Sequence, residues 1–268
     1  MDNRPIGIFD SGLGGLTAVE ALRELLPEEN IVYFGDTGNC PYGTKTREEL
    51  HRLTRHNLDL LASFDCKVIM AACGTVSANC GSVMDAYPIP VFNILTPSVA
   101  VMSRIEGTAP LAVLATEACI RAGVFQQKIE EAAAPSREVM GIPCQDFVSL
   151  CESGHIAPAD PLLTAAVEEY LRPAKEMHVP AVLLGCTHFG IIADAIRAYL
   201  GEDTAVISAS RCAAAVLAEH IVKNGLTGEG ASSRFFTSGS PEAFDRMASL
   251  ILGRNYAARA ERVEPYKL

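Results

Sequence analysis

Several common features are absent from this sequence of 268 residues, and each absence excludes a class of protein. No apolar run is long enough to cross a bilayer, and the first residues, MDNRPIGIFDSG, lack the apolar core of a signal peptide. No run of five basic residues occurs and the formal net charge is -10, so binding of nucleic acid through its phosphates is not expected. We therefore expect a cytoplasmic protein that binds neither membranes nor nucleic acid.

Two cysteine patterns are also missing. The nine cysteines include no Cys-x-x-Cys pair, the usual motif of dithiol redox proteins. Cys186 and His188 form a Cys-x-His pair without a second pair of ligands, so a structural zinc site is not expected. In a reducing compartment most of the cysteines of such a long chain are expected to be free thiols in the core.

The first glycine-rich segment does not match a nucleotide-binding motif. Residues 9–17 read FDSGLGGLT, with Thr17 at the position where a dinucleotide-binding turn has Gly or Ala. Two interpretations stay open. The glycines form a structural turn between a strand and a helix, or they make a corner in which Asp10, Ser11 and backbone amides bind a charged ligand.

The second such segment, GDTGNCPYGTKT at residues 35–46, also lacks the glycine spacing of a phosphate-binding P-loop. Pro41 and Gly43 are typical of a stiff, bent loop. Tyr42 and the loop amides are candidate donors for a carboxylate, and a surface aromatic in a turn is an equally good explanation of Tyr42.

Short apolar runs rich in Val and Ile alternate with longer amphipathic stretches along the chain. Strands are predicted at residues 6–11, 31–36, 67–73, 91–95, 111–116, 137–142, 181–186, 205–210 and 234–239, and helices at 16–26, 46–64, 75–86, 97–105, 117–133, 160–178, 189–200, 210–224 and 241–252. This alternation predicts an α/β fold of mostly parallel sheets covered by helices. Nine strands are many for one open sheet, so two sheets are expected, with crossings near 94–98 and 208–210.

Two of the predicted strands end at a cysteine followed by a helix: KVIMAAC at Cys73 and AVLLGC at Cys186. Ligands of open α/β sheets bind at the carboxyl ends of the strands, where the positive end of a following helix favours a thiolate. One such cysteine is most often a core residue. Two in matching contexts indicate a site.

Two thiols that face one ligand suit the inversion of a carbon centre. Inverting a Cα–H centre without a cofactor needs a base on one face and an acid on the other, and two thiols, one of them deprotonated, can exchange these roles. His188 beside Cys186 adds a group that titrates near neutral pH. A hydrogen-bonded core histidine is the more common explanation of such a residue when it is considered alone.

Four motifs, in order, resemble those of the glutamate racemase family in the aspartate/glutamate racemase superfamily. They are FDSGLGG (9–15), GDTGNCPYG (35–43), AACGTVSA (71–78) and LLGCTHF (183–189), and the resemblance extends from residue 6 to about residue 252. It implies two pseudo-symmetric α/β domains, residues 1–97 plus 208–268 and residues 98–207, with the active site in the cleft between them.

The same resemblance implies a cofactor-independent racemase that interconverts L- and D-glutamate and supplies D-glutamate for peptidoglycan. No pyridoxal phosphate, other cofactor or metal is expected, and the protein is expected to form a homodimer. Two alternatives remain: a racemase for aspartate or another acidic substrate, and a ligand-binding relative without turnover. Retention of both cysteines argues against the second alternative.

Carried over by position, the resemblance also assigns the site residues. Cys73 and Cys186 are the acid/base thiols; Asp10 assists the first, and His188 with Glu152 assists the second. The positions expected to bind the substrate are Asp10, Ser11, Pro41, Tyr42, Gly43, Gly74, Thr75, Thr116, Thr187 and His188.

Two departures from the family pattern concern the substrate. Gly74 stands where the family usually has Asn, and is expected to enlarge the pocket beside Cys73. The family's Gly-Thr-x-x-Thr appears here as Ala115 to Cys119, which lacks one hydroxyl. Each lost hydrogen bond to a charged substrate group costs about 1.5–3 kcal/mol unless it is replaced.

Replacing either cysteine tests the two-thiol hypothesis. We predict that Cys73→Ala and Cys186→Ala each abolish racemisation, because each removes the proton donor or acceptor on one face of the substrate. Circular dichroism in the far ultraviolet checks that each variant is folded, and polarimetry follows the racemisation. Near-normal activity in either variant would show that the assignment is wrong.

Overall fold

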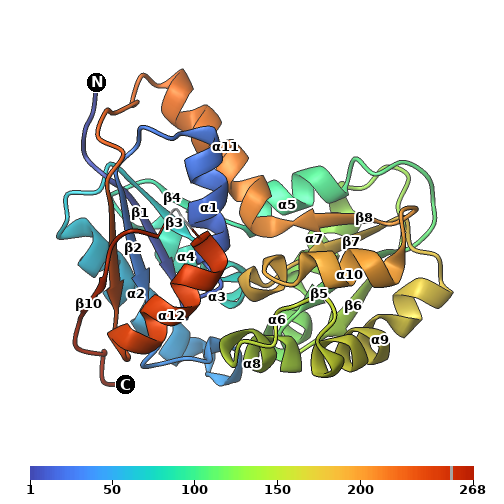
Figure 1. Cartoon of the computed structure of the whole chain (residues 1–268). Coiled ribbons are helices and arrows are strands. Elements are labelled where there is room, and N and C mark those ends of the chain that lie inside the picture. The colour runs from blue at the N-terminus through green and yellow to red at the C-terminus, as the bar shows by residue number, and fades with distance from the viewer. Residues whose placement is uncertain (254–255) are drawn as a thin grey trace.

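Ten strands of the computed structural model, which describes residues 1–253 and 256–268, form two sheets in which every pairing is parallel (Figure 1). The six-stranded sheet has the order β10-β9-β2-β1-β3-β4 and the four-stranded sheet the order β6-β5-β7-β8. The first contains β1 (Ile6–Asp10), β2 (Ile31–Gly35), β3 (Val68–Ala71), β4 (Val91–Asn93), β9 (Ser233–Thr237) and β10 (Ala260–Arg262). The second contains β5 (Leu111–Ala115), β6 (Val139–Pro143), β7 (Ala181–Leu184) and β8 (Ala205–Ser208).

Helices flank both sheets (Figure 1). They are α1 (Leu16–Leu25), α2 (Arg47–Ala62), α3 (Gly74–Asn79), α4 (Gly81–Asp85), α5 (Leu95–Met102), α6 (Glu117–Ala122), α7 (Val124–Ala132), α8 (Asp146–Glu152), α9 (Pro161–Glu176), α10 (Ala193–Leu200), α11 (Ala209–Lys223) and α12 (Pro241–Leu252), with short 3₁₀ helices η1 (Tyr42–Thr44) and η2 (Thr187–Gly190). The predicted α/β class with two parallel sheets is confirmed. None of these helices is long and apolar enough to span a membrane, in the residues that the structure describes.

The central strands are buried on both faces, which explains why they read as continuous apolar runs. In β1, Ile6 and Ile8 belong to one hydrophobic core, whereas Phe9 belongs to another. In β5, Leu111 and Val113 join the same core as Ile6. One apolar core thus continues from the first sheet to the second, where α11 packs against both α1 and α5.

The strands of the larger sheet come from residues 6–93 and 233–262, and those of the smaller sheet from residues 111–208. This composition supports our proposed division into domains of residues 1–97 plus 208–268 and residues 98–207. Both chain termini lie on the side of the larger sheet (Figure 1).

Some predicted helices are divided or displaced. The helix predicted at 75–86 is interrupted at Cys80, whose backbone is not helical, and the helix predicted at 117–133 is interrupted at Gly123, which adopts a left-handed conformation with φ 68°. The helix predicted at 189–200 begins only at Ala193, because η2 occupies the start of that range. Eight of the nine predicted strands end one or two residues early, which leaves Ser11, Cys73 and Cys186 in the turns that follow three of them.

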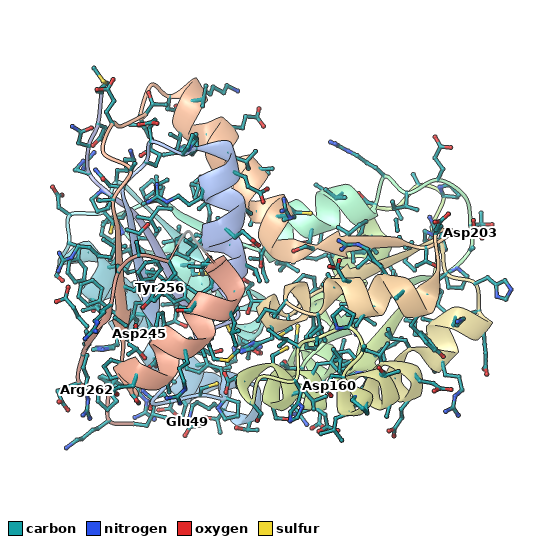
Figure 2. The ribbon with its side chains drawn as sticks, viewed as in Figure 1. Glu49, Asp160, Asp203, Asp245, Tyr256 and Arg262 are labelled. Carbon is teal, nitrogen blue, oxygen red and sulfur yellow. The ribbon has the colours of Figure 1, made fainter. Side chains whose placement is uncertain are left out.

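Among the α-helices and strands, α8 and β10 were not predicted. The strand β10 is only three residues long, and two of its three residues are charged. It is held by Asp245 of α12, which accepts hydrogen bonds from the amide of Ala260 (2.9 Å) and from the hydroxyl of Tyr256. Figure 2 labels Asp245 and Tyr256. It also labels Glu49, which belongs to the capping box of α2, and Asp160, which is the N-cap residue of α9.

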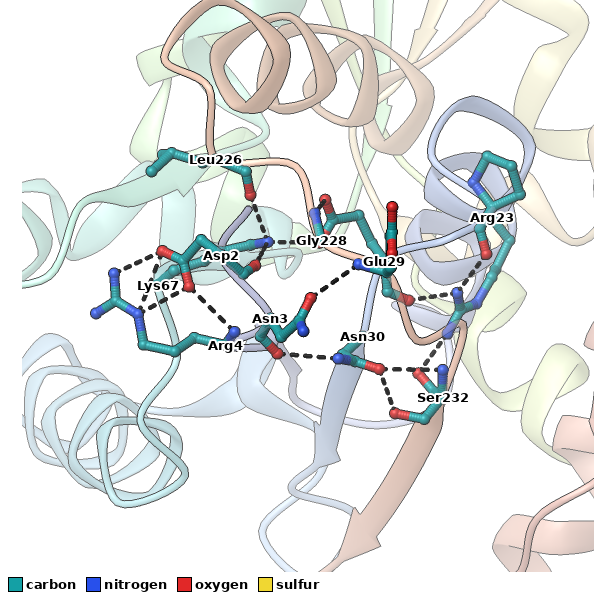
Figure 3. Close-up of polar contacts among 12 residues, drawn as sticks. Asp2, Asn3, Arg4, Arg23, Glu29, Asn30, Lys67, Leu226, Gly228 and Ser232 are labelled. Atoms are coloured by element: carbon teal, nitrogen blue, oxygen red, sulfur yellow. Dashed lines mark hydrogen bonds and ion pairs between the residues drawn. The ribbon is translucent and has the colours of Figure 1, made fainter.

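A buried ion pair fastens the returning C-terminal segment to the larger sheet (Figure 3). The Nζ atom of Lys67 lies 2.5 Å from Oε2 of Glu29, and the two side chains are 0% and 3% exposed. Lys67 also donates to the carbonyl oxygens of Asp2 (2.8 Å) and Leu226 (2.7 Å), and Glu29 accepts from the amide of Gly228 (2.8 Å). The segment between α11 and β9 is therefore tied to the N-terminus and to β3.

Removing one partner of this pair tests its contribution to stability. We predict that Lys67→Met lowers the free energy of unfolding by about 3–5 kcal/mol, because the Glu29 carboxylate stays buried without its counter-ion. Urea denaturation measures the change. The exposed Lys128→Met is the matched control and is expected to change little. The double variant Lys67→Met/Glu29→Leu should recover part of the loss, and a loss unchanged in the double variant would contradict the electrostatic explanation.

Candidate active site

The carboxyl ends of β1 and β3 meet those of β5 and β7 around a small cavity of about 20 Å³. Its lining contains Ser11, Cys40, Pro41, Tyr42, Gly43, Cys73, Gly74, Thr75, Thr116, Gln145, Val148, Gly185, Cys186, Thr187 and His188. A wider groove of about 550 Å³ lies along α2, but it contains no cysteine. The small cavity is the place where the two cysteines at matching strand ends come together, although it has room for only about one water molecule.

Cys73 stands two residues beyond the end of β3 and precedes the first residue of α3. It is 4% exposed, and its Sγ atom lies 3.7 Å from the hydroxyl oxygen of Ser11. Burial, followed by the nearby carboxylate of Asp10, raises the pKa of the Cys73 thiol well above its ordinary value. In this closed arrangement Cys73 is therefore a protonated thiol, suited to donate a proton.

Asp10 links the two sheets behind Cys73. Its Oδ2 atom accepts hydrogen bonds from the amide of Gly15 (2.7 Å) and from the hydroxyl of Thr187 (3.2 Å). Thr187 belongs to η2, which follows β7 of the smaller sheet. Its Oδ1 atom is buried and has no hydrogen-bond partner in the described part of the chain. A buried carboxylate oxygen without a partner is unfavourable, so a cationic group of a ligand is expected to approach it.

Cys186 has a charged pair beside it. Its Sγ atom is 3.8 Å from Nδ1 of His188, and Nε2 of the same ring is 3.1 Å from Oε1 of Glu152, at the end of α8. Burial alone would lower the pKa of His188, but the contacts with Cys186 and Glu152 outweigh it and raise the pKa to about 10. Burial opposes ionisation of Glu152 as well, yet His188 holds the pKa of Glu152 below its ordinary value. At neutral pH the pair is an imidazolium and a carboxylate.

A third cysteine contacts this pair from the opposite sheet. The thiol of Cys40, in the loop after β2, donates to Oε1 of Glu152 at 3.4 Å. The hydroxyls of Thr75 and Thr116, which follow β3 and β5, lie 3.2 Å apart. Side chains from the two sheets thus meet directly on several sides of the cavity.

The glycine-rich turn after β1 is required by this close approach. A Cβ atom on Gly14 would lie 2.5 Å from both the amide nitrogen of His188 and the hydroxyl oxygen of Thr187, and one on Gly12 would lie 2.7 Å from Oε1 of Glu152. Real Cβ atoms do not approach other atoms so closely. The turn therefore admits the side chains of the second sheet, which gives the glycines of the FDSGLGG segment a structural role. The binding of a charged ligand by Asp10 and Ser11 stays a prediction.

Tyr42 is buried in the cavity wall, and its hydroxyl is already engaged. It donates to Oδ2 of Asp36 at 2.5 Å and accepts from the side-chain amide of Asn57 at 2.9 Å. Its single proton is thus directed away from the cavity, contrary to the expectation that the hydroxyl serves a substrate carboxylate. The backbone amides of this loop remain as donors.

The expected site residues fall into two groups. All expected substrate-binding residues except Asp10 line the cavity, and so do both cysteines, whereas Asp10 and Glu152 stand behind it. Four lining residues were missed: Cys40, Gln145, Val148 and Gly185. Cys40 and Gly185 lie inside the motifs GDTGNCPYG and LLGCTHF, but Gln145 and Val148 belong to the region of α8, a helix that was not predicted.

No three His, Cys, Asp or Glu side chains are grouped so that they could hold a metal ion, within residues 1–253 and 256–268.

Comparison with known proteins agrees with this arrangement. The model of the Asp/Glu/Hydantoin racemase family matches residues 17–217. A glutamate racemase of Aquifex aeolicus is 36% identical over 97% of this chain and 96% of its own length. A solved glutamate racemase of Francisella tularensis, in complex with D-glutamate, is 32% identical with a TM-score of 0.86, over 100% of this chain and 98% of that one. One from Bacillus anthracis is 27% identical with a TM-score of 0.90, over the whole of both chains.

The two parallel sheets and the relatives together define an isomerase of the racemase class. The chain belongs to the Asp/Glu/hydantoin racemase family.

The raised pKa of His188 provides a direct test of the site's charges. We predict that Glu152→Gln lowers the pKa of His188 by about 1–3, because the neutral amide no longer stabilises the imidazolium. Proton NMR of the His188 ring across a pH series measures the change. Glu176→Gln, at the exposed end of α9, is the control and should leave the titration unchanged. A His188 titration that is identical in wild type and Glu152→Gln would contradict the pairing.

Proposed function

We propose that this protein interconverts L- and D-glutamate with Cys73 and Cys186 as the two acid/base groups. The observation that carries the proposal is that the two cysteines, from strand ends of different sheets, line one closed cavity. The relatives named glutamate racemases support the choice of substrate, and one of their structures contains D-glutamate.

In the proposed reaction, one cysteine thiolate removes the proton from the Cα atom of glutamate. The thiol on the opposite face then gives its own proton to the resulting carbanion, so one C–H bond breaks and another forms with inverted configuration. The first cysteine ends as a thiol and the second as a thiolate. The reverse reaction uses the same groups in exchanged roles and consumes no further reactant.

The two thiols have neighbours of opposite charge, which favour different protonation states. The carboxylate of Asp10 lies on the Cys73 side, whereas the His188 imidazolium lies beside Cys186. A neighbouring positive charge stabilises a thiolate and a negative one disfavours it. We infer that Cys73 carries its proton in the resting enzyme, and that Cys186 has the neighbouring positive charge of His188.

Hydroxyl groups and backbone amides are the proposed contacts for the charged ends of the substrate. Four residues of the cavity lining carry a hydroxyl group: Ser11, Thr75, Thr116 and Thr187. Asp10, with an unpartnered buried oxygen, is proposed to receive the substrate's ammonium group once the cavity opens.

Aspartate is the second candidate substrate. The departures at Gly74 and Cys119 remove two polar side chains that the family pattern places near the substrate. The choice between glutamate and the shorter aspartate is therefore the part of the proposal that needs an experiment. A role in supplying D-glutamate for peptidoglycan, a cytoplasmic location and a homodimer are further predictions from the same family resemblance.

Turnover in deuterium oxide tests the proposal. Purified protein without added cofactor is incubated with L-glutamate, L-aspartate and other L-amino acids, and proton NMR and polarimetry follow the Cα position. We expect L-glutamate to lose its Cα proton signal and to racemise, because the incoming hydrogen is taken from solvent-exchanged thiol.

The control is the variant Cys73→Ala/Cys186→Ala, which should do neither. Turnover of aspartate but not glutamate would establish the second candidate. Exchange without loss of optical rotation would contradict the two-face mechanism, and inactivity on every amino acid would indicate a binding protein.

A further inference from the structure

Gly74 packs directly against the backbone of the opposite sheet's strand end. A Cβ atom on Gly74 would overlap the carbonyl oxygen of Gly185, and would lie 3.2 Å from its carbonyl carbon and 3.7 Å from Cα of Cys186. These obstacles are backbone atoms, so no side-chain rotation relieves them. The expectation that Gly74 enlarges the pocket is therefore wrong in this closed arrangement, because the space is filled by Gly185.

The glycine is not required by its own backbone conformation. Gly74 is the first residue of α3 and does not have the left-handed φ that favours glycine, unlike Gly123. Glycine also lowers the stability of a helix by up to about 1 kcal/mol relative to alanine. Lack of space is thus the physical reason for glycine at this position.

The contact joins the residues next to both proposed acid/base thiols. Gly74 follows Cys73 and Gly185 precedes Cys186, so the distance between these glycines governs the distance between the two cysteine-bearing turns. The cysteines are only 4% and 8% exposed. A cavity of about 20 Å³ is also far too small for an amino acid, so the two turns must separate to admit one.

We propose that Gly74 is a positioning residue, which lets the turns carrying Cys73 and Cys186 close to backbone contact and so sets how near the two thiols come to one substrate carbon. The effect of Gly74 on turnover rests on the proposed function, whereas its effect on the closure of the two turns does not. Without a ligand the site is shut by the contact of Gly74 with Gly185. After a substrate enters, the same lack of a side chain lets the turns close on it as far as the substrate allows.

A side chain at position 74 should hold the two turns apart. In the ligand-free protein, we expect Gly74→Ala to make alkylation of Cys73 and Cys186 by iodoacetamide at least about tenfold faster, because the rate follows the population of the open form. Gly74→Asn should have a larger effect, since its side chain is longer. Mass spectrometry of the labelled peptides measures each cysteine separately.

Gly81 supplies a matched control. It is the first residue of α4 and follows Cys80, as Gly74 follows Cys73, but a Cβ atom there would meet nothing within 4 Å. Gly81→Ala and Gly81→Asn should leave alkylation of Cys73 and Cys186 unchanged. Circular dichroism and thermal unfolding establish that all four variants are folded.

The values of kcat and KM distinguish a positioning role of Gly74 from a role in stability alone. If glutamate is racemised, Gly74→Ala should reduce kcat by about 10²-fold, the usual effect of moving reacting groups by about 1 Å. KM should change little or fall, because substrate no longer has to open a shut site. Inactivity of the wild-type protein would defeat the proposed function and leave the alkylation result intact.

Equal alkylation rates for wild type and both Gly74 variants would overturn the proposal. So would a kcat for Gly74→Asn at or above that of wild type. Should the variants fail to fold, X-ray scattering of the wild-type protein decides the matter: a shut resting site predicts that saturating glutamate does not reduce the radius of gyration, and a clear reduction would contradict it.

Discussion

The close approach of backbone to backbone, where the two parallel sheets meet, is the constraint on which the rest of the site depends. At Gly74 and Gly14 no side chain fits, because Gly185 in one case and Thr187 and His188 in the other occupy the space. This approach places both cysteines in one small cavity. It also brings charges of opposite sign to its two ends, since burial strengthens the influence of each neighbouring group on the thiols.

Most of the fold followed from the alternation of buried strands and helices. Strands such as β1 and β5 are covered on both faces, so their apolar runs were unmistakable, and parallel pairing follows from the intervening helices. The errors have local causes. Cys80 and Gly123 interrupt helices whose apolar pattern continues across the break, and β10 is held by the side chain of Asp245, a contact distant in sequence.

The sequence predicts the site residues that stand at strand ends. It does not predict the contacts that form where the two sheets meet. Cys73 and Cys186 stand at strand ends, and the motifs around them carry most of the lining. The engagement of Tyr42 with Asp36, and the packing of Gly74 on Gly185, arise from three-dimensional approach. A missing side chain suggests empty space when a sequence is read alone, whereas here it marks the place where two chain segments touch.

If each thiol works on one face of the same carbon, the two single-cysteine variants must react with different enantiomers of one substrate. Analogues such as L- and D-3-chloroglutamate lose chloride once their Cα proton is removed, so a single base suffices for elimination. Rates of chloride release are measured for Cys73→Ala and Cys186→Ala with each enantiomer. Each variant should eliminate chloride from one enantiomer only, and the two variants should have opposite preferences. Elimination from both enantiomers by one variant, or the same preference in both, would contradict it.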